Sequence, residues 1–442
     1  MSEKIKERIG HLQSLWYNAY IKFKIRVLQK KFETRSQHKE RNMHCVQKIT
    51  DNIYWVGGND RRLERFENMF PIPGGVCYNS YLILDEKTCL MDTVDTAISR
   101  LFIENITHVL NGRDLDYLVI NHMEPDHCAN IEELVRRYPN IKIVGNKKTF
   151  QFIGQFYNFD YCNNSHEVKD CEMLSLGKHN LKFMAMPMIH WPEVMFTYEE
   201  TEKILFSADA FGTFGAMAGN IFADETDFEH HYLEEARRYY SNIVGKYGAQ
   251  VQSALKKLSV YDIRMICPLH GPIWRENVEY FIGKHDKWSR YEPEKNGVVL
   301  VYASMYGNTE NIINVIANKL AQKGVKDMRM YDISKTHPSY IIADIWKYSH
   351  VVFGSVTYNN GLYYGMESLL NEIKALNLQN RKVGLVGNGT WSPQAIKVMQ
   401  EILCTMKNME IVGTPFEMTS SMKDNEEEIV DRFVEDFYSS IS

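Results

Sequence analysis

The pattern of apolar and polar positions divides the chain into three segments and a short connection. In residues 1–42, apolar positions recur at spacings of three and four, which predicts one amphipathic helix. In residues 43–283, short apolar runs such as "YLILDE", "DYLVINH" and "IRMICPLHG" alternate with turns and helical stretches, which predicts a mixed domain with large sheets. In residues 297–442, runs such as "GVVLVYAS" and "HVVFGSV" alternate with helical patterns, which predicts a parallel, doubly wound sheet. The polar residues 284–296 are expected to be the linker.

The first segment is basic as well as amphipathic. Lys and Arg outnumber Asp and Glu in residues 1–42, and an apolar-aromatic face opposite a basic face is typical of a helix on an anionic membrane. We favour two plainer interpretations. The segment is either an appendage that packs on the body, or the product of a misassigned start upstream of Met43.

Charge and cysteine content narrow the functional classes. A net charge of −5 gives no nucleic-acid footprint, and no apolar run approaches the ~20 residues of a membrane span. No signal-peptide pattern is visible, and the eight cysteines include no C-x-x-C pair of the kind that rubredoxin-like or zinc-ribbon modules use. We therefore expect a cytoplasmic protein with free thiols and without a nucleic-acid partner.

A dense cluster of possible metal ligands follows the strand-like run "DYLVI". The stretch "NHMEPDHCAN" places four such residues within six positions, and three more apolar runs each end on a His or an Asp. The candidate ligands are His122, Glu124, Asp126, His127, His190, Asp209 and His270. Four imidazoles and three carboxylates suit zinc and also a pair of non-haem irons. Asp209 suits a bridge, because one carboxylate can contact two cations.

Three loops after strand-like runs in the last segment predict a phosphate and flavin site. "YASMYGNTENI" joins a strand to a helix, where hydroxyls and backbone N–H groups can hold a phosphate without a Lys. No P-loop pattern is present, which argues against hydrolysis of nucleoside triphosphates. The candidate contacts are Ser304, Met305, Tyr306, Gly307, Asn308 and Thr309, then Thr357, Tyr358, Asn359, Asn360 and Gly361, then Gly389, Thr390 and Trp391. The first loop looks like the FMN-phosphate loop of flavodoxins.

The two sites together favour redox chemistry. Zinc cannot accept electrons from a flavin, whereas a pair of irons can. One alternative is a hydrolase with a metal-bound hydroxide and a regulatory flavodoxin domain. Another alternative is an electron carrier whose metal site is vestigial. The seven intact ligand positions argue against it.

From about residue 45 to the end, the chain resembles one family. The order H-x-E-x-D-H, His, Asp, His-Gly is similar to that of metallo-β-lactamase-like domains, with Glu124 where hydrolases usually have a second His. That likeness implies an αββα sandwich with a two-metal site at its edge. Combined with "IYWVGGNDRRLERFE", "MIHWPE", "FSADAFGTFG", "PLHGPIW" and "GSVTYNNGL", the motifs resemble the flavodiiron proteins.

The resemblance implies a mechanism and partners. His122, Glu124 and His190 would hold one iron, Asp126, His127 and His270 the other, and Asp209 would bridge them. The implied reaction is reduction of dioxygen to water, of nitric oxide to nitrous oxide, or both, with FMN supplying electrons. A head-to-tail homodimer or a dimer of dimers is implied, as is an external one-electron donor such as rubredoxin. Residues 1–42 lie outside the family pattern.

Overall fold

A computed structural model describes residues 44–441. The predictions for residues 1–42 and for Met43 lie outside the described residues. Among the helices of the described residues, none combines the length and the apolar composition that a membrane crossing requires.

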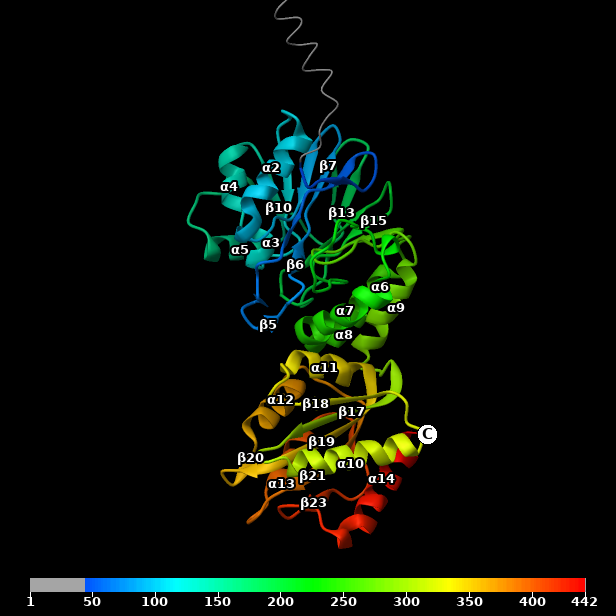
Figure 1. Cartoon of the computed structure of the whole chain (residues 1–442). Helices are drawn as coiled ribbons and strands as arrows, with labels where there is room; N and C mark the ends of the chain where they lie inside the picture. Colours follow the sequence, from blue (N-terminus) through cyan, green and yellow to red (C-terminus); the bar gives the residue numbers. More distant parts are fainter. Residues whose placement is uncertain (1–43, 442) are drawn as a thin grey trace, which may run out of the picture. The chain divides into compact units, whose positions relative to one another are not determined.

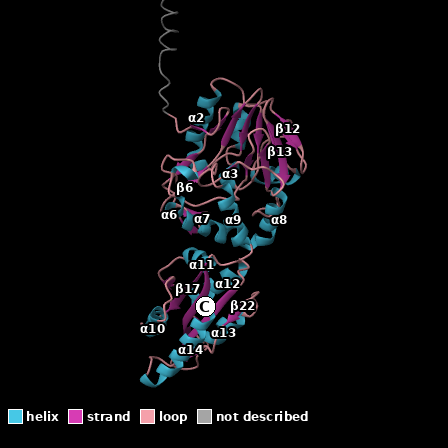
Figure 2. Ribbon diagram, turned by 90° about the vertical axis from the view of Figure 1, so that its right-hand side faces the viewer, coloured by secondary structure: helices cyan, strands magenta, loops and turns pink. Residues whose placement is uncertain are grey.

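The first half of residues 44–441 contains two stacked sheets, drawn as magenta strands in Figure 2. The first sheet has the strand order β1 (Gln47–Lys48), β2 (Ile53–Trp55), β7 (Tyr81–Leu84), β8 (Thr88–Met91), β9 (Tyr117–Val119), β10 (Lys142–Gly145) and β11 (Ser165–Glu167). The second has the order β12 (Met173–Ser175), β13 (Asn180–Ala185), β14 (Met195–Glu199), β15 (Ile204–Phe206) and β16 (Met265–Cys267). Two small hairpins complete the strands, β3 (Gly58–Asp60) with β6 (Val76–Tyr78) and β4 (Arg65–Phe66) with β5 (Phe70–Pro71).

Alternation along the strands explains the layers. In β7, Tyr81 and Ile83 pack into a core that includes Phe206 of the second sheet, whereas Leu82 packs into a separate core with Phe102 of a covering helix. The helices over the first sheet are α2 (Ser99–Leu110), α4 (Ile131–Arg137) and α5 (Lys147–Phe156), and α8 (Gly248–Leu258) packs on the second (Figure 1). The expected αββα sandwich is confirmed.

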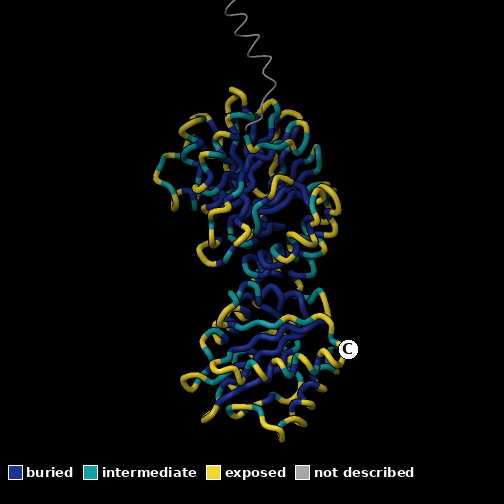
Figure 3. The backbone as a smooth tube through the Cα atoms, viewed as in Figure 1, coloured by how far each residue is buried: buried dark blue, intermediate teal, exposed yellow. Residues whose placement is uncertain are grey.

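The second half is a parallel sheet with helices on both faces. Its central order is β18 (Met328–Asp332), β17 (Lys295–Ala303), β19 (Tyr348–Tyr358), β21 (Arg381–Asn388) and β22 (Met409–Ile411), with β23 (Phe416–Met418) beside β21 and β20 (Gly361–Leu362) antiparallel to β19. Val298 and Leu300 face α10 (Asn308–Gln322) and α14 (Glu427–Ile441), and Val299 and Val301 face the other side. That side carries α11 (Pro338–Lys347), α12 (Tyr364–Ala375) and α13 (Ala395–Leu403). The central strands β17, β19 and β21 are buried along most of their length (Figure 3). The strand order 2-1-3-4-5 is flavodoxin-like, as expected.

The connection between the halves differs from the sequence prediction. Helix α9 (Val278–Ser289) runs into residues 284–296, and β17 begins at Lys295. His285 and Trp288 are buried on one face of α9 with Phe281, at spacings of three and four. Intervening Lys and Asp residues conceal this narrow apolar stripe in the sequence. The non-helical connection is therefore only residues 290–294.

Glu294 fastens this connection to the helices of the first half. Its carboxylate accepts hydrogen bonds from Arg237 of α7 (Leu233–Tyr239), from Nε1 of Trp288 at 2.8 Å and from Nζ of Lys284 at 3.0 Å. Burial raises the pKa of Glu294, but these partners outweigh it and lower the pKa from 4.5 to about 2. The lowered pKa means that the carboxylate stabilises the fold as long as it stays ionised.

We predict that Glu294→Gln lowers the free energy of unfolding at pH 7 on the order of 3 kcal/mol, since each pKa unit corresponds to about 1.4 kcal/mol. The wild-type contribution is complete above pH 4.5 and is lost as the pH falls toward 2, so the variant should show a flatter acid dependence. Urea unfolding between pH 7 and pH 3 measures both effects. Glu292→Gln, a neighbouring half-exposed site, is the control and should change little. An unchanged acid dependence in Glu294→Gln would contradict the assignment.

Candidate functional site

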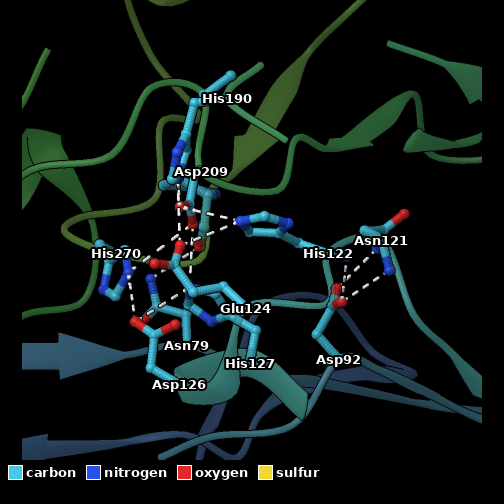
Figure 4. A network of polar contacts seen from close by, with 12 residues as sticks. Asn79, Asp92, Asn121, His122, Glu124, Asp126, His127, His190, Asp209 and His270 are labelled. Atoms are coloured by element: carbon cyan, nitrogen blue, oxygen red, sulfur yellow. Dashed lines mark hydrogen bonds and ion pairs between the residues drawn. The ribbon is translucent and has the colours of Figure 1, made fainter. Parts of the chain in front are cut away.

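The seven candidate ligands meet at one edge of the sandwich (Figure 4). The loop after β9 presents His122 and Glu124, and the short helix α3 (Pro125–Cys128) presents Asp126 and His127. His190, Asp209 and His270 follow β13, β15 and β16. All seven are buried or nearly so, although they come from four separate segments.

The side chains form two groups. In the first, Oε2 of Glu124 lies 3.2 Å from Nε2 of His122 and 3.1 Å from Nε2 of His190. In the second, Oδ2 of Asp126 lies 3.4 Å from Nε2 of His127 and 3.3 Å from Nε2 of His270. Each group offers three nitrogen or oxygen donors around one small space, so the geometry provides for two cations.

Asp209 lies between the two groups. Its Oδ2 is 3.2 Å from Nε2 of His190, in the first group. Its Oδ1 is 3.0 Å from Nε2 of His127, in the second group. The two oxygens of one carboxylate thus face different groups, which is the arrangement that a bridging ligand needs.

Unsatisfied polar atoms show that these residues fit metal ions. Within residues 44–441, both carboxylate oxygens of Asp126, Oδ1 of Asp209, and Nε2 of His127 and of His270 are buried without a hydrogen-bond partner. A buried polar atom left unpaired costs about 1–3 kcal/mol. Cations with nitrogen and oxygen ligands would satisfy all of them at once.

The carboxylates also create a negative field at the site. Burial lowers the pKa of His190, but hydrogen bonds to Asp209 and Glu124 outweigh it and raise the pKa to about 9. Burial likewise lowers the pKa of His127, whereas Asp126 and Asp209 raise it to about 9. The site therefore favours added positive charge, and metal ions supply it while leaving the imidazoles neutral.

A second set of contacts orients the imidazoles. Nδ1 of His122 donates to Oε1 of Glu193 at 2.8 Å, and Nδ1 of His270 donates to the carbonyl oxygen of Cys77 at 2.8 Å. Asp92 accepts hydrogen bonds from the backbone N–H groups of Asn121 and His122 at 2.7 and 3.1 Å. The two ring hydrogen bonds fix the tautomer that presents Nε2 to the site, and Asp92 fixes the backbone that carries His122. Sequence reasoning missed Glu193 and Asp92, although Asp92 directly follows the apolar run "CLM" and Glu193 follows "HWP".

Aromatic rings surround the site. The ring centroids of Phe66, Tyr78 and Tyr239 lie 5.2, 5.7 and 5.6 Å from that of His270. The ring of Trp191 lies 5.5 Å from that of His122. This wall limits the access of water, which strengthens every electrostatic interaction inside it.

A pocket of about 400 Å³ lies at the carboxyl ends of the parallel strands. Eleven of the fourteen predicted flavin contacts line it: Ser304, Met305, Tyr306, Asn308, Thr309, Thr357, Asn359, Asn360, Gly389, Thr390 and Trp391. Gly307, Tyr358 and Gly361 do not line it, whereas Val356, Asn388 and Ser420 do and were not predicted.

Local contacts shape this pocket. Gly307 has φ +88° and lets the chain enter α10, with its N–H donating to Oγ of Ser304 at 3.1 Å. The side-chain amide of Asn388 donates to Oγ1 of Thr309 at 3.2 Å and to the carbonyl oxygen of Ser420 at 3.1 Å. The first N–H groups of α10 therefore open into a cradle that suits a phosphate.

Each half of the chain matches a different protein-family model. The family model described as ODP family beta lactamase matches residues 76–271, and the one described as Flavodoxin matches residues 300–429. An uncharacterized protein of Methanocaldococcus jannaschii is 34% identical over 81% of this chain and 89% of its own length. The anaerobic nitric oxide reductase flavorubredoxin of Pectobacterium atrosepticum is 30% identical over 85% of this chain and 72% of its own.

Solved structures extend the likeness to both halves together. The rubredoxin oxygen:oxidoreductase from Desulfovibrio gigas is 30% identical, with a TM-score of 0.84 over 90% of this chain and 98% of that one. The flavodiiron protein from Giardia intestinalis is 26% identical, with a TM-score of 0.84 over 90% and 96%. This chain belongs to the flavodiiron protein family. Both halves of the flavodiiron architecture are present in it, in the family's order.

We predict that Asp209→Asn lowers metal binding at both groups, because its two oxygens face both. Glu124→Gln makes the same chemical change in one group only and should leave the other group's metal in place. Elemental analysis of the purified variants measures the ratio, with FMN content as the check that the second half is intact. Equal metal loss in the two variants would contradict a bridging role for Asp209.

Proposed function

We propose that this flavodiiron protein reduces nitric oxide to nitrous oxide, dioxygen to water, or both, at a non-haem di-iron site that receives electrons from FMN. The observation that carries the proposal is the carboxylate of Asp209, whose two oxygens face different donor groups. Among the described residues, several inward atoms of the second group have no hydrogen-bond partner. The flavin pocket in the same chain supports a redox role, because a hydrolase needs no electrons.

The seven side chains divide between the irons according to their geometry. His122, Glu124 and His190 would hold one iron, and Asp126, His127 and His270 would hold the other. Asp209 would bridge the pair. A donor set of four imidazoles and three carboxylates supports iron, which accepts mixed nitrogen and oxygen ligands and changes its oxidation state.

The chain's own residues prepare the site for the reaction. A pair of irons cycles between ferrous and ferric states, and FMN takes up two electrons and releases them singly. Glu193 and the Cys77 carbonyl hold His122 and His270 with Nε2 toward the metals. Two nitric oxide molecules need two electrons and two protons to give nitrous oxide and water, and one dioxygen needs four of each to give two waters. The aromatic wall keeps bulk water away from the reacting gas.

The residues that line the flavin pocket would contact different parts of FMN. Ser304, Asn308 and Thr309 lie at the amino end of α10 and would hold the FMN phosphate. Thr357 and Asn359 would contact the flavin ring, and Trp391 would cover it. Trp391 is 77% exposed in the chain alone, so it is free to stack on the flavin or on a partner.

The partners follow from this exposed rim. Tyr306 and Trp391 are 90% and 77% exposed beside the pocket, as expected for side chains that another protein covers. We propose a head-to-tail homodimer or a dimer of dimers, in which the FMN of one protomer approaches the di-iron site of its partner. Rubredoxin is the proposed electron donor, since it is part of the names of two relatives. The buried thiols of Cys77, Cys89 and Cys128 support a location in the reducing cytoplasm.

The purified protein should be yellow and should contain one FMN and two irons per chain. Reduced protein should consume nitric oxide or dioxygen, because a ferrous pair would supply two electrons and reduced FMN two more, which is enough for either gas. Flavin absorbance, elemental analysis and anaerobic gas assays measure these properties. Zinc in both positions with hydrolysis of esters and no gas consumption would show a hydrolase instead.

Turnover should require an external carrier. This 442-residue sequence contains neither a C-x-x-C pair for a rubredoxin iron nor a G-x-G-x-x-G after a strand for a nicotinamide. We expect slow gas consumption with NADH alone and fast consumption when rubredoxin and its reductase are added. Equal rates in the two mixtures would exclude the external carrier. Loss of the stimulation at high salt would indicate docking through complementary charges, which salt screens over about 10 Å.

A further inference from the structure

A small apolar cavity lies between the second sheet and α8. Its volume is about 10 Å³, which is room for the centre of one molecule the size of water. Its wall includes Ile189, Phe211, Val251, Ala254, Leu255 and Leu258. Ile189 directly precedes His190, and Phe211 lies two residues after Asp209. Two segments thus each carry a proposed ligand and a residue of the cavity wall one or two positions away.

The chemistry of this cavity disfavours water. His285 is the polar member of its wall, and Nδ1 of His285 is already hydrogen-bonded to the carbonyl oxygen of Phe281 at 3.1 Å. Burial lowers the pKa of His285 to about 3, so the imidazole is neutral. A buried water needs two to four polar partners, which this wall does not provide. A small neutral molecule with little hydration to lose fits better.

The cavity also approaches the protein surface. A groove of about 150 Å³ runs over Ala185, Met186 and Pro187 and along α8 past Gln250, Ser253 and Lys257. Ala254 lines both this groove and the inner cavity. Ala254 is buried and has one of the smallest side chains, so the two spaces approach each other at this residue.

We propose that the groove, Ala254 and the apolar cavity form the entry route by which a neutral diatomic gas reaches the metal site. The proposal rests on the function proposed above, because nitric oxide and dioxygen are such gases. A dry apolar space concentrates them relative to water and excludes ions. Neither space shares a lining residue with the flavin pocket.

Enlarging residue 254 tests the route. In the series Ala254→Val, Ala254→Leu and Ala254→Phe, the second-order rate constant for oxidation of the fully reduced holoenzyme should fall stepwise, reaching a loss of about tenfold or more for Phe. The rate at saturating gas should change much less, because the ligands are untouched. Stopped-flow mixing with dioxygen and with nitric oxide measures both quantities. The graded series keeps the test valid even where the largest variant does not fold.

Ala249→Phe is the matched control. Ala249 is on the same helix, is exposed, and lines neither space, so the same substitution there should leave the rate constant unchanged. Iron and FMN contents of every variant are measured alongside. Equal rate constants for wild type and the folded 254 variants would overturn the route and leave the proposed function intact. A wild-type holoenzyme that consumes neither gas would overturn the function and, with it, the route.

Gas binding independent of turnover provides the second measurement. Crystals of the iron-loaded full chain pressurised with krypton should show a krypton atom between Phe211 and Leu255. The same treatment of Ala254→Phe crystals should leave that position empty, with the Ala249→Phe crystals behaving as wild type. Krypton at this position in Ala254→Phe as well would overturn the role of Ala254 as the barrier.

Discussion

The central constraint in this protein is the burial of four imidazoles and three carboxylates in one small space. Bringing such groups out of water is costly unless each is paired, and here several inward-facing atoms have no hydrogen-bond partner among residues 44–441. Two cations would resolve the problem, and Asp209 would couple them because its oxygens face both groups. The metals would then help to hold the four ligand-bearing segments in place.

The residues around the ligands determine which ligand atoms a metal can reach and how polar the site is. Glu193 and the Cys77 carbonyl occupy Nδ1 of His122 and His270, so only Nε2 is available to a metal. Phe66 and Tyr239 pack beside His270 and keep the local dielectric low. Electrons must then come from a carrier that does not bring water with it. A flavin bound at the strand ends of the second half meets that need, since it delivers electrons without opening the metal site.

The sequence was informative where a polar residue interrupts an apolar pattern. The ligands end strand-like runs, and the sharp change from apolar to ionisable residues made them visible without any structure. Contacts between residues far apart in the sequence could not be predicted. Glu193 is hydrogen-bonded to His122, 71 residues away, and Asn388 to Thr309, 79 residues away. Tyr358 was expected in the flavin pocket but is outside its wall. Asn359 and Asn360, with φ of +49° and +58°, turn the chain there, and the Tyr358 ring packs 6.4 Å from Tyr363.

The segment from Ala208 to Phe211 serves both the polar donor site and the apolar cavity. Ala208 and Phe211 both have positive φ, +48° and +66°, which costs roughly 1–2 kcal/mol for each residue with a Cβ. Hydrogen bonds hold the turn, from Leu269 N–H to the Ala208 carbonyl at 2.9 Å and from Ser207 Oγ to the Ala210 carbonyl at 2.8 Å. In this turn Asp209 faces the two donor groups. Ala210 and Phe211, the next two residues, line the apolar cavity. A charged site and an apolar space are thus placed on either side of one short, strained segment.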